Sequence, residues 1–308
     1  MTGHFPFQGV GDLDKQKVLV IGLGEVGISL LAILKESAAF DVYGFDTNKE
    51  RMFNLNQGPL PKKVDVMHLC IPCTDLNLFV VTAKNYANQF APALIIINST
   101  LIPGTTVEVF KRCEVPTAHS PTRGVHESPQ HMIWEMKRWV KYVGGADLDA
   151  GQKTKEHFEK AGLRSKTLKS SKESELAKLF ETTYRAWMIT CFQEMHRIAR
   201  ALGADFEDTV DFLDDTHRVR LDRPVMFPGV IGGHCQIPNT QLLLKIYDSD
   251  LLRDILKSNE KRKEEIKDDA VRKEVEKVKK KAQATEKELT EKIAKCEKKS
   301  SSQGKLGA

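Results

Sequence analysis

The chain has 308 residues, of which 41% are hydrophobic, and a formal net charge of +5. This length can hold about two domains and a substantial core. No stretch reaches the roughly 20 apolar residues of a membrane span, and the amino terminus lacks a basic region followed by an apolar one. We therefore expect a cytosolic protein with no membrane partner. Because the six cysteines are scattered rather than densely spaced, we also expect reduced thiols.

Positive charge gathers in the last part of the chain. Residues 251–308 hold 18 Lys and Arg against 12 Asp and Glu, whereas residues 1–250 hold 29 against 30. Both signs alternate in this tail, and no aromatic residue stands among them. This pattern is typical of a solvated helix rather than of a groove that follows phosphates, so we expect no nucleic-acid partner.

Residues 17–145 alternate short apolar runs with helical segments, a pattern typical of a parallel sheet with helices on both faces. The predicted strands are "KVLVIG", "DVYGF", "VDVMHLCIP", "ALIIINST", "VPTAHS" and "VKYVGG". The polar residues 151–170 are predicted to add one helix and a short strand. We therefore predict an α/β fold with a Rossmann-type doubly wound parallel sheet, which forms a first domain over residues 1–170.

A single long helix is predicted over residues 174–202, and Gly203 is placed to end it. A shorter helix over 205–214 and a loop over 215–240 follow, and we assign 171–250 to an all-α dimerisation region. The long helix carries apolar positions around much of its circumference, which favours burial against other helices or a second subunit in a homodimer. These positions are Leu176, Leu179, Phe180, Thr183, Trp187, Phe192, Met195, Ile198 and Leu202.

Beyond about residue 251 the composition shifts to Lys, Glu and Ala, which predicts a third region, 251–308, as a charged helical tail. A weak heptad pattern leaves two interpretations open, a marginal coiled coil or a helix that lies on the body. Its positions are Val271, Val275, Val278, Ala282, Thr285 and Leu289. The final segment "KKSSSQGKLGA" is predicted to be disordered.

The segment "KVLVIGLGEVG" joins the first predicted strand to the first predicted helix and contains Gly-x-Gly-x-x-Gly. In a dinucleotide-binding turn the first glycine allows the tight turn, the second admits a pyrophosphate, and the third lets the helix pack on the strand. The amino terminus of the helix then faces the anion. We predict that Gly22, Gly24, Glu25, Val26 and Gly27 contact a dinucleotide.

Asp46 ends the second predicted strand, 19 residues after Gly27. A carboxylate at this place accepts hydrogen bonds from ribose hydroxyls and repels a 2′-phosphate, which favours NAD over NADP. Lys49 and Arg51 follow Asp46 closely and leave NADP open as an alternative.

Four segments occur in the order and approximate spacing of the nucleotide-sugar 6-dehydrogenases, the UDP-glucose and GDP-mannose dehydrogenase family. They are "VLVIGLGEVG", "INSTLIPGTT", "ELAKLFETTYRAW" and "GVIGGHC". The chain resembles this family over roughly residues 16–245. The resemblance implies the NAD-dependent oxidation of a primary alcohol of a sugar or nucleotide sugar to an acid, through an aldehyde captured as a thiohemiacetal on a cysteine.

The resemblance also implies the residues of the site. Cys235 matches the nucleophile, and a thiolate is a strong nucleophile; a small buried side chain is the alternative. Lys178, on the long helix, matches a lysine that holds a developing alkoxide, unless it is a solvated surface lysine. Thr100 matches a hydroxyl that binds the cofactor or a catalytic water, with a strand-ending cap as its alternative. His234 is expected to position the substrate.

Arg218, Arg220 and Arg223 lie where the family brings an arginine across the dimer interface to the substrate, and we select Arg220 as the candidate. Cys70 and Cys73 form a Cys-x-x-Cys where the family has a cofactor-contacting turn. We predict no metal site, because no second ligand pair stands at the required spacing.

The sequence departs from the family pattern in several places. Asn239 replaces an acid four residues after the cysteine; an amide can orient water but cannot take its proton. Thr182, a predicted substrate contact, replaces an asparagine, and Thr122 replaces a glutamate for which Glu127 is a nearby substitute. Residues 251–308 are too short and too charged for the family's C-terminal nucleotide-binding domain.

We therefore predict an NAD-dependent dehydrogenase that acts on a sugar or nucleotide sugar. Two alternatives stay open. A two-electron dehydrogenase of the β-hydroxyacid type has the same cofactor turn and a central-helix lysine but does not need Cys235. The second alternative is a non-catalytic NAD-binding protein, and the missing acids at positions 122 and 239 are the observation that supports it.

Overall fold

The computed structural model describes residues 15–55, 57–124, 128–233 and 235–303, with side chains up to residue 292. The chain forms two compact units, residues 1–178 (unit 1) and 179–308 (unit 2). The division falls inside the long helix rather than before it, and the charged tail belongs to unit 2. Both points differ from the three regions that we predicted.

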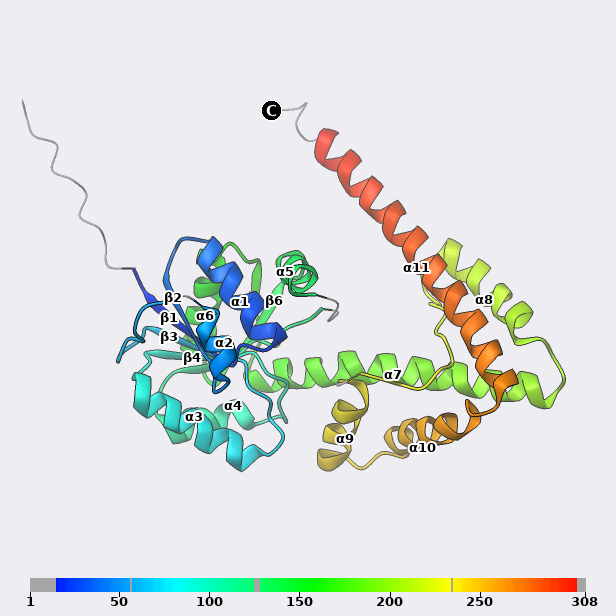
Figure 1. Ribbon diagram of the computed structural model, residues 1–308, viewed down its shortest axis with the longest axis horizontal. Helices are drawn as coiled ribbons and strands as arrows, with labels where there is room; N and C mark the ends of the chain where they lie inside the picture. Colours follow the sequence, from blue (N-terminus) through cyan, green and yellow to red (C-terminus); the bar gives the residue numbers. More distant parts are fainter. Residues whose placement is uncertain (1–14, 56, 125–127, 234, 304–308) are drawn as a thin grey trace, which may run out of the picture. The chain divides into compact units, whose positions relative to one another are not determined.

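Unit 1 is an α/β unit, as predicted, and its helices and strands alternate along the chain (Figure 1). Its elements are β1 (Lys17–Ile21), α1 (Glu25–Glu36), β2 (Asp41–Phe45), α2 (Lys49–Phe53), β3 (Val66–Leu69), α3 (Leu76–Phe90), β4 (Leu94–Ile97), α4 (Thr105–Cys113), β5 (Thr117–His119), α5 (Pro129–Arg138), β6 (Lys141–Gly145), α6 (Leu148–Lys160) and β7 (Ser165–Thr167). Within the described residues the strands form one sheet of seven in the order β2-β1-β3-β4-β5-β6-β7.

One strand departs from the predicted parallel arrangement. β6 runs antiparallel to β5, although β7 then runs parallel to β6. Lys141, the first residue of β6, donates a hydrogen bond to the carbonyl of Ser120, just beyond the end of β5 (3.0 Å). The chain therefore returns to the sheet at the edge where β5 ended, and β6 has to run in the opposite direction.

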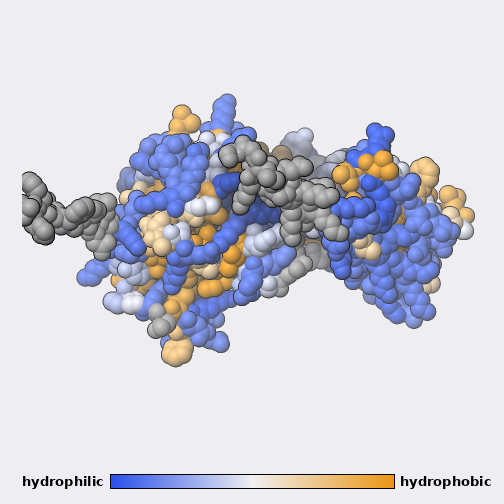
Figure 2. Space-filling view, turned by 90° about the horizontal axis from the view of Figure 1, so that it is seen from above, coloured by the Kyte–Doolittle hydropathy of each residue, from blue (hydrophilic) through white to orange (hydrophobic). Residues whose placement is uncertain are grey.

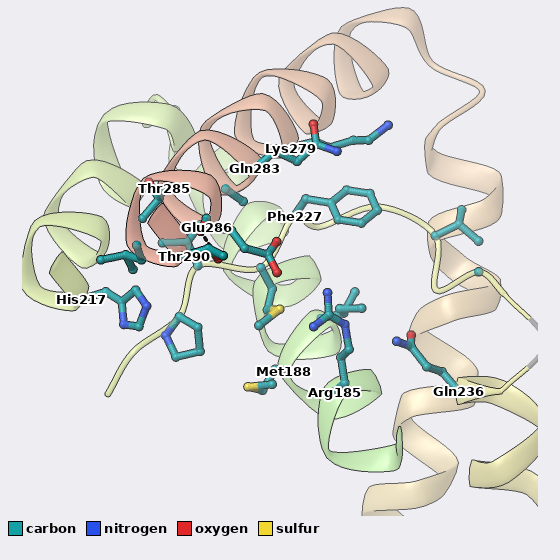
Figure 3. Close-up of a pocket in the computed structure, with 18 residues that line it drawn as sticks. Arg185, Met188, His217, Phe227, Gln236, Lys279, Gln283, Thr285, Glu286 and Thr290 are labelled. Carbon is teal, nitrogen blue, oxygen red and sulfur yellow. Dashed lines mark hydrogen bonds between the residues drawn. The ribbon is translucent and has the colours of Figure 1, made fainter. Parts of the chain in front are cut away.

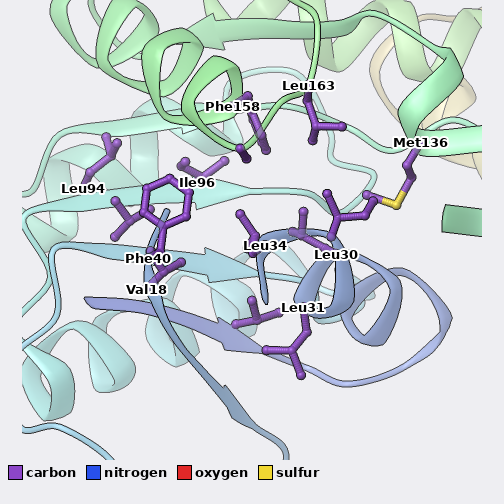
Figure 4. Close-up of a cluster of buried hydrophobic side chains, with 14 of the residues drawn as sticks. Val18, Leu30, Leu31, Leu34, Phe40, Leu94, Ile96, Met136, Phe158 and Leu163 are labelled. Atoms are coloured by element: carbon purple, nitrogen blue, oxygen red, sulfur yellow. The ribbon is translucent and has the colours of Figure 1, made fainter. Parts of the chain in front are cut away.

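The sheet buries apolar side chains on both faces because successive residues of a strand point to opposite sides. Val18 and Val20 of β1 pack with side chains of α1, α5 and α6 (Figure 4). Leu19 and Ile21 of the same strand pack on the other face with α3 and α4. This two-sided burial explains why β1 reads as an uninterrupted apolar run.

Unit 2 is helical, and its first helix begins in unit 1. The predicted long helix is present as α7 (Ser171–Ala201), followed by α8 (Phe206–Arg220), α9 (Gln236–Ile246), α10 (Asp250–Glu265) and α11 (Asp269–Gln303). The predicted short helix is longer than expected, because α8 continues to Arg220 and ends at Leu221 in a left-handed conformation (φ 58°). Since α9 begins at Gln236, the predicted loop is shorter, spanning 221–235.

The charged tail lies on unit 2, where α11 runs along α8 (Figure 1). The predicted heptad positions Val271, Val275, Val278 and Thr285 are buried. Arg218 of α8 also donates hydrogen bonds to Thr285 (2.8 Å) and to Glu288. Of the two open interpretations, the structure therefore has the helix that lies on the body. It continues to Gln303, into the segment that we predicted to be disordered.

The long helix α7 is covered on one side only. Leu179, Thr183 and Phe192 are buried, as predicted, whereas Phe180 and Leu202 are 56% and 78% exposed.

Hydrophilic residues dominate the face shown in Figure 2, and patches of hydrophobic residues interrupt them. None of the described helices is both long enough and apolar enough to cross a membrane.

Candidate functional site

The glycine turn between β1 and α1 has the predicted geometry. Gly22 adopts a left-handed φ of 87°, and a Cβ there would lie 2.7 Å from the carbonyl oxygen of Cys70. A Cβ at Gly27 would lie only 1.8 Å from the carbonyl oxygen of Gly22, whereas a Cβ at Gly24 would meet nothing within 4 Å. Gly22 and Gly27 thus allow close backbone packing, and Gly24 leaves open space at the start of α1.

The amino terminus of α1 faces this open space. Gly24 is the N-cap residue and provides no side-chain cap for the helix. Glu25 is exposed in the first turn, and Val26 beside it is half-buried. Uncapped N–H groups at the start of a helix carry partial positive charge, so this end of α1 suits an anion such as a pyrophosphate.

Asp46 follows β2 and lies against the glycine turn. Its carboxylate accepts hydrogen bonds from the N–H groups of Leu23 (2.7 Å) and Asn48 (2.8 Å) and pairs with Arg51 (3.1 Å). Burial favours a higher pKa, but these donors outweigh it and lower the pKa of Asp46. The carboxylate is therefore charged and keeps lone pairs for further donors, since a carboxylate has about four acceptor positions.

The carboxyl ends of β4 and β5 are tied together by His119. Its Nε2 lies 2.9 Å from the carbonyl oxygen of Ser99, and its Nδ1 lies 2.8 Å from Oγ of Ser174. Burial lowers the pKa of His119 to about 3, so the ring is neutral. Thr100, next to Ser99, is half-buried at this edge of the sheet.

Glu175 fixes the start of α7 to the start of α4. Its buried carboxylate accepts hydrogen bonds from the N–H groups of Gly104 (2.7 Å) and Thr106 (2.9 Å) and from the Thr106 hydroxyl (2.6 Å). Burial raises the pKa of Glu175 despite these bonds. No local pattern in the sequence points to Glu175, because its partners lie about 70 positions earlier in the chain.

Lys141 is a second residue of this edge to which no local sequence pattern points. It is almost fully buried, and its ammonium donates hydrogen bonds to the carbonyls of Ser120 (3.0 Å) and Pro121 (3.4 Å). Burial, together with the neighbouring charge of Lys178, lowers the pKa of Lys141 to about 7. A lysine at the start of a predicted strand carries no signal of burial, because long side chains there usually reach solvent.

Lys178 is half-buried and lies close enough to His119 and Lys141 to lower the pKa of both. It therefore faces the carboxyl edge of the sheet within unit 1. Thr122, three residues after His119, occupies the position at which the family has a glutamate. It is buried, and its Oγ1 has no hydrogen-bond partner among the described atoms. Its predicted substitute, Glu127, lies outside the described residues.

In unit 2 the structure brings together Cys235, Asn239 and Thr182. Cys235 is the half-buried N-cap of α9, and its carbonyl accepts a hydrogen bond from the N–H of Asn239 (2.9 Å). The buried Asn239 amide then donates to Oγ1 of Thr182 (2.9 Å). Two of the positions at which the sequence departs from the family pattern thus contact each other.

The remaining predicted residues are less constrained. Arg220 is exposed and pairs with Asp222 (3.3 Å), whereas Arg218 pairs with Asp214 (2.8 Å) and α11. His234 lies outside the described residues. No cluster of His, Cys, Asp or Glu in the described part of the chain could hold a metal ion.

Cys70 and Cys73 are free thiols. Burial raises the pKa of Cys70 to about 12 and that of Cys73 to about 11. Reactive cysteines instead have lowered pKa values. These two side chains therefore have the properties of packing groups at the end of β3.

Comparison with known proteins identifies the helical region. Residues 172–261 match the family model "UDP-glucose/GDP-mannose dehydrogenase family, central domain". This segment is similar to the central domain of that family. It contains α7 to α10 almost entirely, including Lys178, Thr182, Cys235 and Asn239.

The chain is also similar to whole dehydrogenases. UDP-N-acetyl-D-mannosamine dehydrogenase of Methanocaldococcus jannaschii is 29% identical over 265 residues, which cover 71% of this chain and 59% of the relative. The chain thus spans less than two thirds of that relative. The corresponding Pyrococcus horikoshii enzyme is 24% identical over 80% of this chain and 68% of the relative.

Two solved structures have the same fold. The Pyrococcus horikoshii UDP-D-ManNAc dehydrogenase has a TM-score of 0.69 at 22% identity and covers 80% of this chain and 68% of its own. The Mycobacterium tuberculosis 3-hydroxyisobutyrate dehydrogenase has a TM-score of 0.62 at 16% identity and covers 82% and 94%. The predicted family resemblance and Rossmann-type fold are confirmed.

Proposed function

We propose that the protein is an NAD-dependent dehydrogenase that oxidises a primary alcohol of a sugar or nucleotide sugar. The observation that carries this proposal is the combination in one chain of the glycine turn with its bound Asp46 carboxylate and a dehydrogenase central domain that contains Cys235. The similar enzymes act on UDP-N-acetyl-D-mannosamine and, in one case, UDP-glucose, which supports a nucleotide sugar.

The residues of unit 1 fit NAD. Gly24 leaves open space at the uncapped start of α1 for the pyrophosphate, and Asp46 offers its carboxylate to the ribose. Arg51 is engaged with that carboxylate and would have to leave it to bind a 2′-phosphate. When bound, NAD accepts the hydride that leaves the alcohol carbon.

Lys178 and Thr100 assist the oxidation in this proposal. The Lys178 ammonium stabilises the negative charge that develops on the alcohol oxygen as its proton leaves, since a positive charge acts most strongly where the opposite charge forms. The Thr100 hydroxyl, at the carboxyl edge of the sheet, orients a water molecule or the cofactor.

Cys235 captures the aldehyde. A carbon–sulfur bond forms between its Sγ and the carbonyl carbon, the thiol proton goes to the carbonyl oxygen, and the product is a thiohemiacetal. In a second oxidation the thiohemiacetal carbon would lose a hydride to a second NAD and its hydroxyl would lose a proton, which gives a thioester. Water then attacks the thioester, the carbon–sulfur bond breaks, and the acid and the thiol are released. The flanking glycines of "GVIGGHC" leave the approach to the sulfur open. His234 and Arg220 are proposed to bind the substrate.

Asn239 limits the hydrolytic step. Its amide donates to Thr182 and is buried, so it can orient water through its oxygen but cannot accept a proton. We therefore expect hydrolysis of the thioester to be slower than oxidation. A two-electron dehydrogenase of the β-hydroxyacid type remains the alternative, because it requires no thiol.

Product analysis tests the role of the thiol. The full chain is incubated with NAD and a panel of sugars and nucleotide sugars, and acid and aldehyde are separated by chromatography. Cys235→Ser should reduce acid formation at least about 1,000-fold, because a serine hydroxyl is a much weaker nucleophile than a cysteine thiol at neutral pH. Cys296→Ser, near the end of α11 and outside the proposed site, is the matched control and should retain activity. Unchanged oxidation by Cys235→Ala would support the two-electron alternative.

The proposed enzyme is a homodimer through α7. Large apolar side chains follow one exposed line of this helix at intervals of three and four residues, a spacing that gathers them on one face. We call this line the α7 stripe; it contains Phe180, Tyr184, Trp187, Cys191, Met195, Ile198 and Leu202. Exposed apolar surfaces of this kind are unusual in monomers, and a second copy presents the same stripe in a symmetric pair.

A further inference from the structure

Unit 2 contains a cavity that the proposed chemistry does not yet use. It measures about 690 Å³ and lies between α7, the loop 221–235 and α11 (Figure 3). This volume is in the range of roughly 300–1,000 Å³ that is usual for small-molecule sites. Gln236, the residue after Cys235, belongs to its wall, whereas α11 lies beyond the family central domain. We call this cavity the α11 pocket.

Positive side chains enter the α11 pocket from two helices. Arg185 of α7 points into it, and within the described residues its guanidinium forms no ion pair (Figure 3). Lys279 of α11 lies over the Phe227 ring (5.8 Å to its centre) and 3.5 Å from Glu276. A planar guanidinium that has its donors available matches a phosphate or carboxylate group.

Groups suited to hydroxyls line the same space. Glu286 and Gln283 of α11 and Gln236 of α9 supply carboxylate and carboxamide groups, which bind hydroxyls as acceptors and donors. Glu286 faces Arg185 across the cavity without forming an ion pair with it (Figure 3). Phe227 adds an apolar wall. Such a set of a cation, planar polar groups and an aromatic ring is complementary to an anionic polyol.

We infer that the α11 pocket binds a sugar that carries a phosphate group, with the phosphate at Arg185 and the hydroxyls at Glu286, Gln283 and Gln236. The inference rests on the proposed function in one respect, since Gln236 of the pocket lining follows Cys235 directly in the chain, and Cys235 would act on the bound sugar. It adds that the charged tail, through α11, forms part of the binding site.

Calorimetric titration of the full chain without cofactor tests the inference. The probes are UDP-glucose, glucose 1-phosphate, uridine diphosphate and glucose. We expect at least one of the two phosphate-bearing sugars to bind tenfold or more tightly than glucose, and the tighter of them identifies a nucleotide sugar or a simple sugar phosphate as the ligand. Failure of both to exceed glucose, including an absence of measurable binding, would overturn the inference.

Matched variants locate the binding. Arg185→Gln and Glu286→Gln should each weaken binding of the preferred sugar at least tenfold. Lys280→Gln and Glu291→Gln are exposed on α11, outside the pocket lining, and should bind within twofold of the unmodified chain. Thermal melting verifies that all four fold, as expected for replacements at exposed positions. Wild-type affinity in both pocket variants would contradict the inference.

The two proposals fail separately. Tight binding of a phosphate-bearing sugar by every chain that keeps Arg185 and Glu286, without formation of reduced cofactor, contradicts the dehydrogenase alone. Turnover of a nucleotide sugar with an unchanged KM in Glu286→Gln and Arg185→Gln contradicts the α11 pocket alone.

Discussion

Unit 1 and unit 2 bury their apolar side chains in different ways. Unit 1 covers both faces of its sheet; β3 and β4 are buried along their whole length, and β1 is buried from Val18 to Ile21. Unit 2 has smaller buried clusters and leaves the α7 stripe exposed, together with Phe212 and Val219 of α8 (79% and 80%). Unit 1 therefore has the larger core, whereas unit 2 leaves a continuous line of apolar side chains exposed on α7.

The buried polar groups differ in the same sense. Unit 1 buries three histidines, His68, His119 and His157, and a lysine without an ion pair among the described residues, Lys141. Unit 2 holds its buried Arg262 with hydrogen bonds to α7 and an ion pair to Glu265 (3.2 Å). The two units should consequently respond differently to surface changes, to core changes and to pH.

Changes in the α7 stripe should act on the assembly of the protein rather than on its folding. If two copies pair through it, Trp187→Glu with Ile198→Glu places charges in an apolar interface and should convert a dimer into a monomer, with a loss of affinity above about 100-fold, or roughly 3 kcal/mol. Sedimentation velocity measures the mass. Phe212→Glu, an exposed apolar residue outside the stripe, is the control and should stay dimeric. A monomeric wild-type chain would contradict the dimer.

Gly27→Val should destabilise unit 1 by about 4 kcal/mol, because its Cβ would overlap the carbonyl oxygen of Gly22 (1.8 Å) and the backbone has to move. Urea unfolding measures the loss. Gly24→Ala is the matched comparison, since its Cβ meets nothing within 4 Å; it should unfold like wild type but bind NAD at least tenfold more weakly. Normal NAD binding by Gly24→Ala would argue against the proposed pyrophosphate position.

Arg262→Ala should destabilise unit 2 by about 3 kcal/mol. The side chain is fully buried and donates to the carbonyl of Gln193 (2.9 Å) and bonds with Nδ1 of His196 (3.1 Å), so truncation leaves buried groups unpaired. Arg262→Met fills more of the space and should cost less. Arg272→Ala, at an exposed arginine of α11, should change the free energy of unfolding by under about 1 kcal/mol.

Acid should destabilise unit 1 gradually, over several pH units. Burial lowers the pKa of His157 to about 4 and that of His119 to about 3, and it also lowers the pKa of His68, whose Nε2 lies 2.9 Å from that of His157. Unfolded histidines titrate near 6.5 and bind protons that the folded ones do not. The three neutral histidines therefore contribute fully to the free energy of unfolding of unit 1 above pH 6.5. This contribution falls as the pH decreases toward 4, by on the order of 1 kcal/mol per histidine and pH unit.

Tryptophan fluorescence separates the two units in this experiment. Trp134 and Trp139 report on unit 1 and Trp187 on unit 2, so Trp187→Phe and the Trp134→Phe, Trp139→Phe double variant each leave one unit with its reporter. The unit 1 signal should change at the higher pH. Fluorescence transitions at the same pH in the two variants would contradict the predicted difference between unit 1 and unit 2.

Local patterns in the sequence predicted much of the fold. The glycine spacing predicted the turn at residues 22–27, apolar runs predicted the strands, and the helical period with Gly203 predicted α7 to within a few residues. The family motifs also predicted the central domain that residues 172–261 match. These features depend on backbone preferences and on side-chain periods within a few neighbouring positions, which the order of residues specifies directly.

Other features depend on contacts between distant segments. Glu175 caps α4 from α7, Lys141 is buried at the end of β5, and Thr182 bonds Asn239 57 positions later. The packing of α11 on α8 likewise settled two interpretations that its weak heptad left open. No local rule assigns such partners, because burial and pairing arise only when the topology brings separate elements together, and a lysine or glutamate has the same intrinsic preferences whether it ends in solvent or in the core.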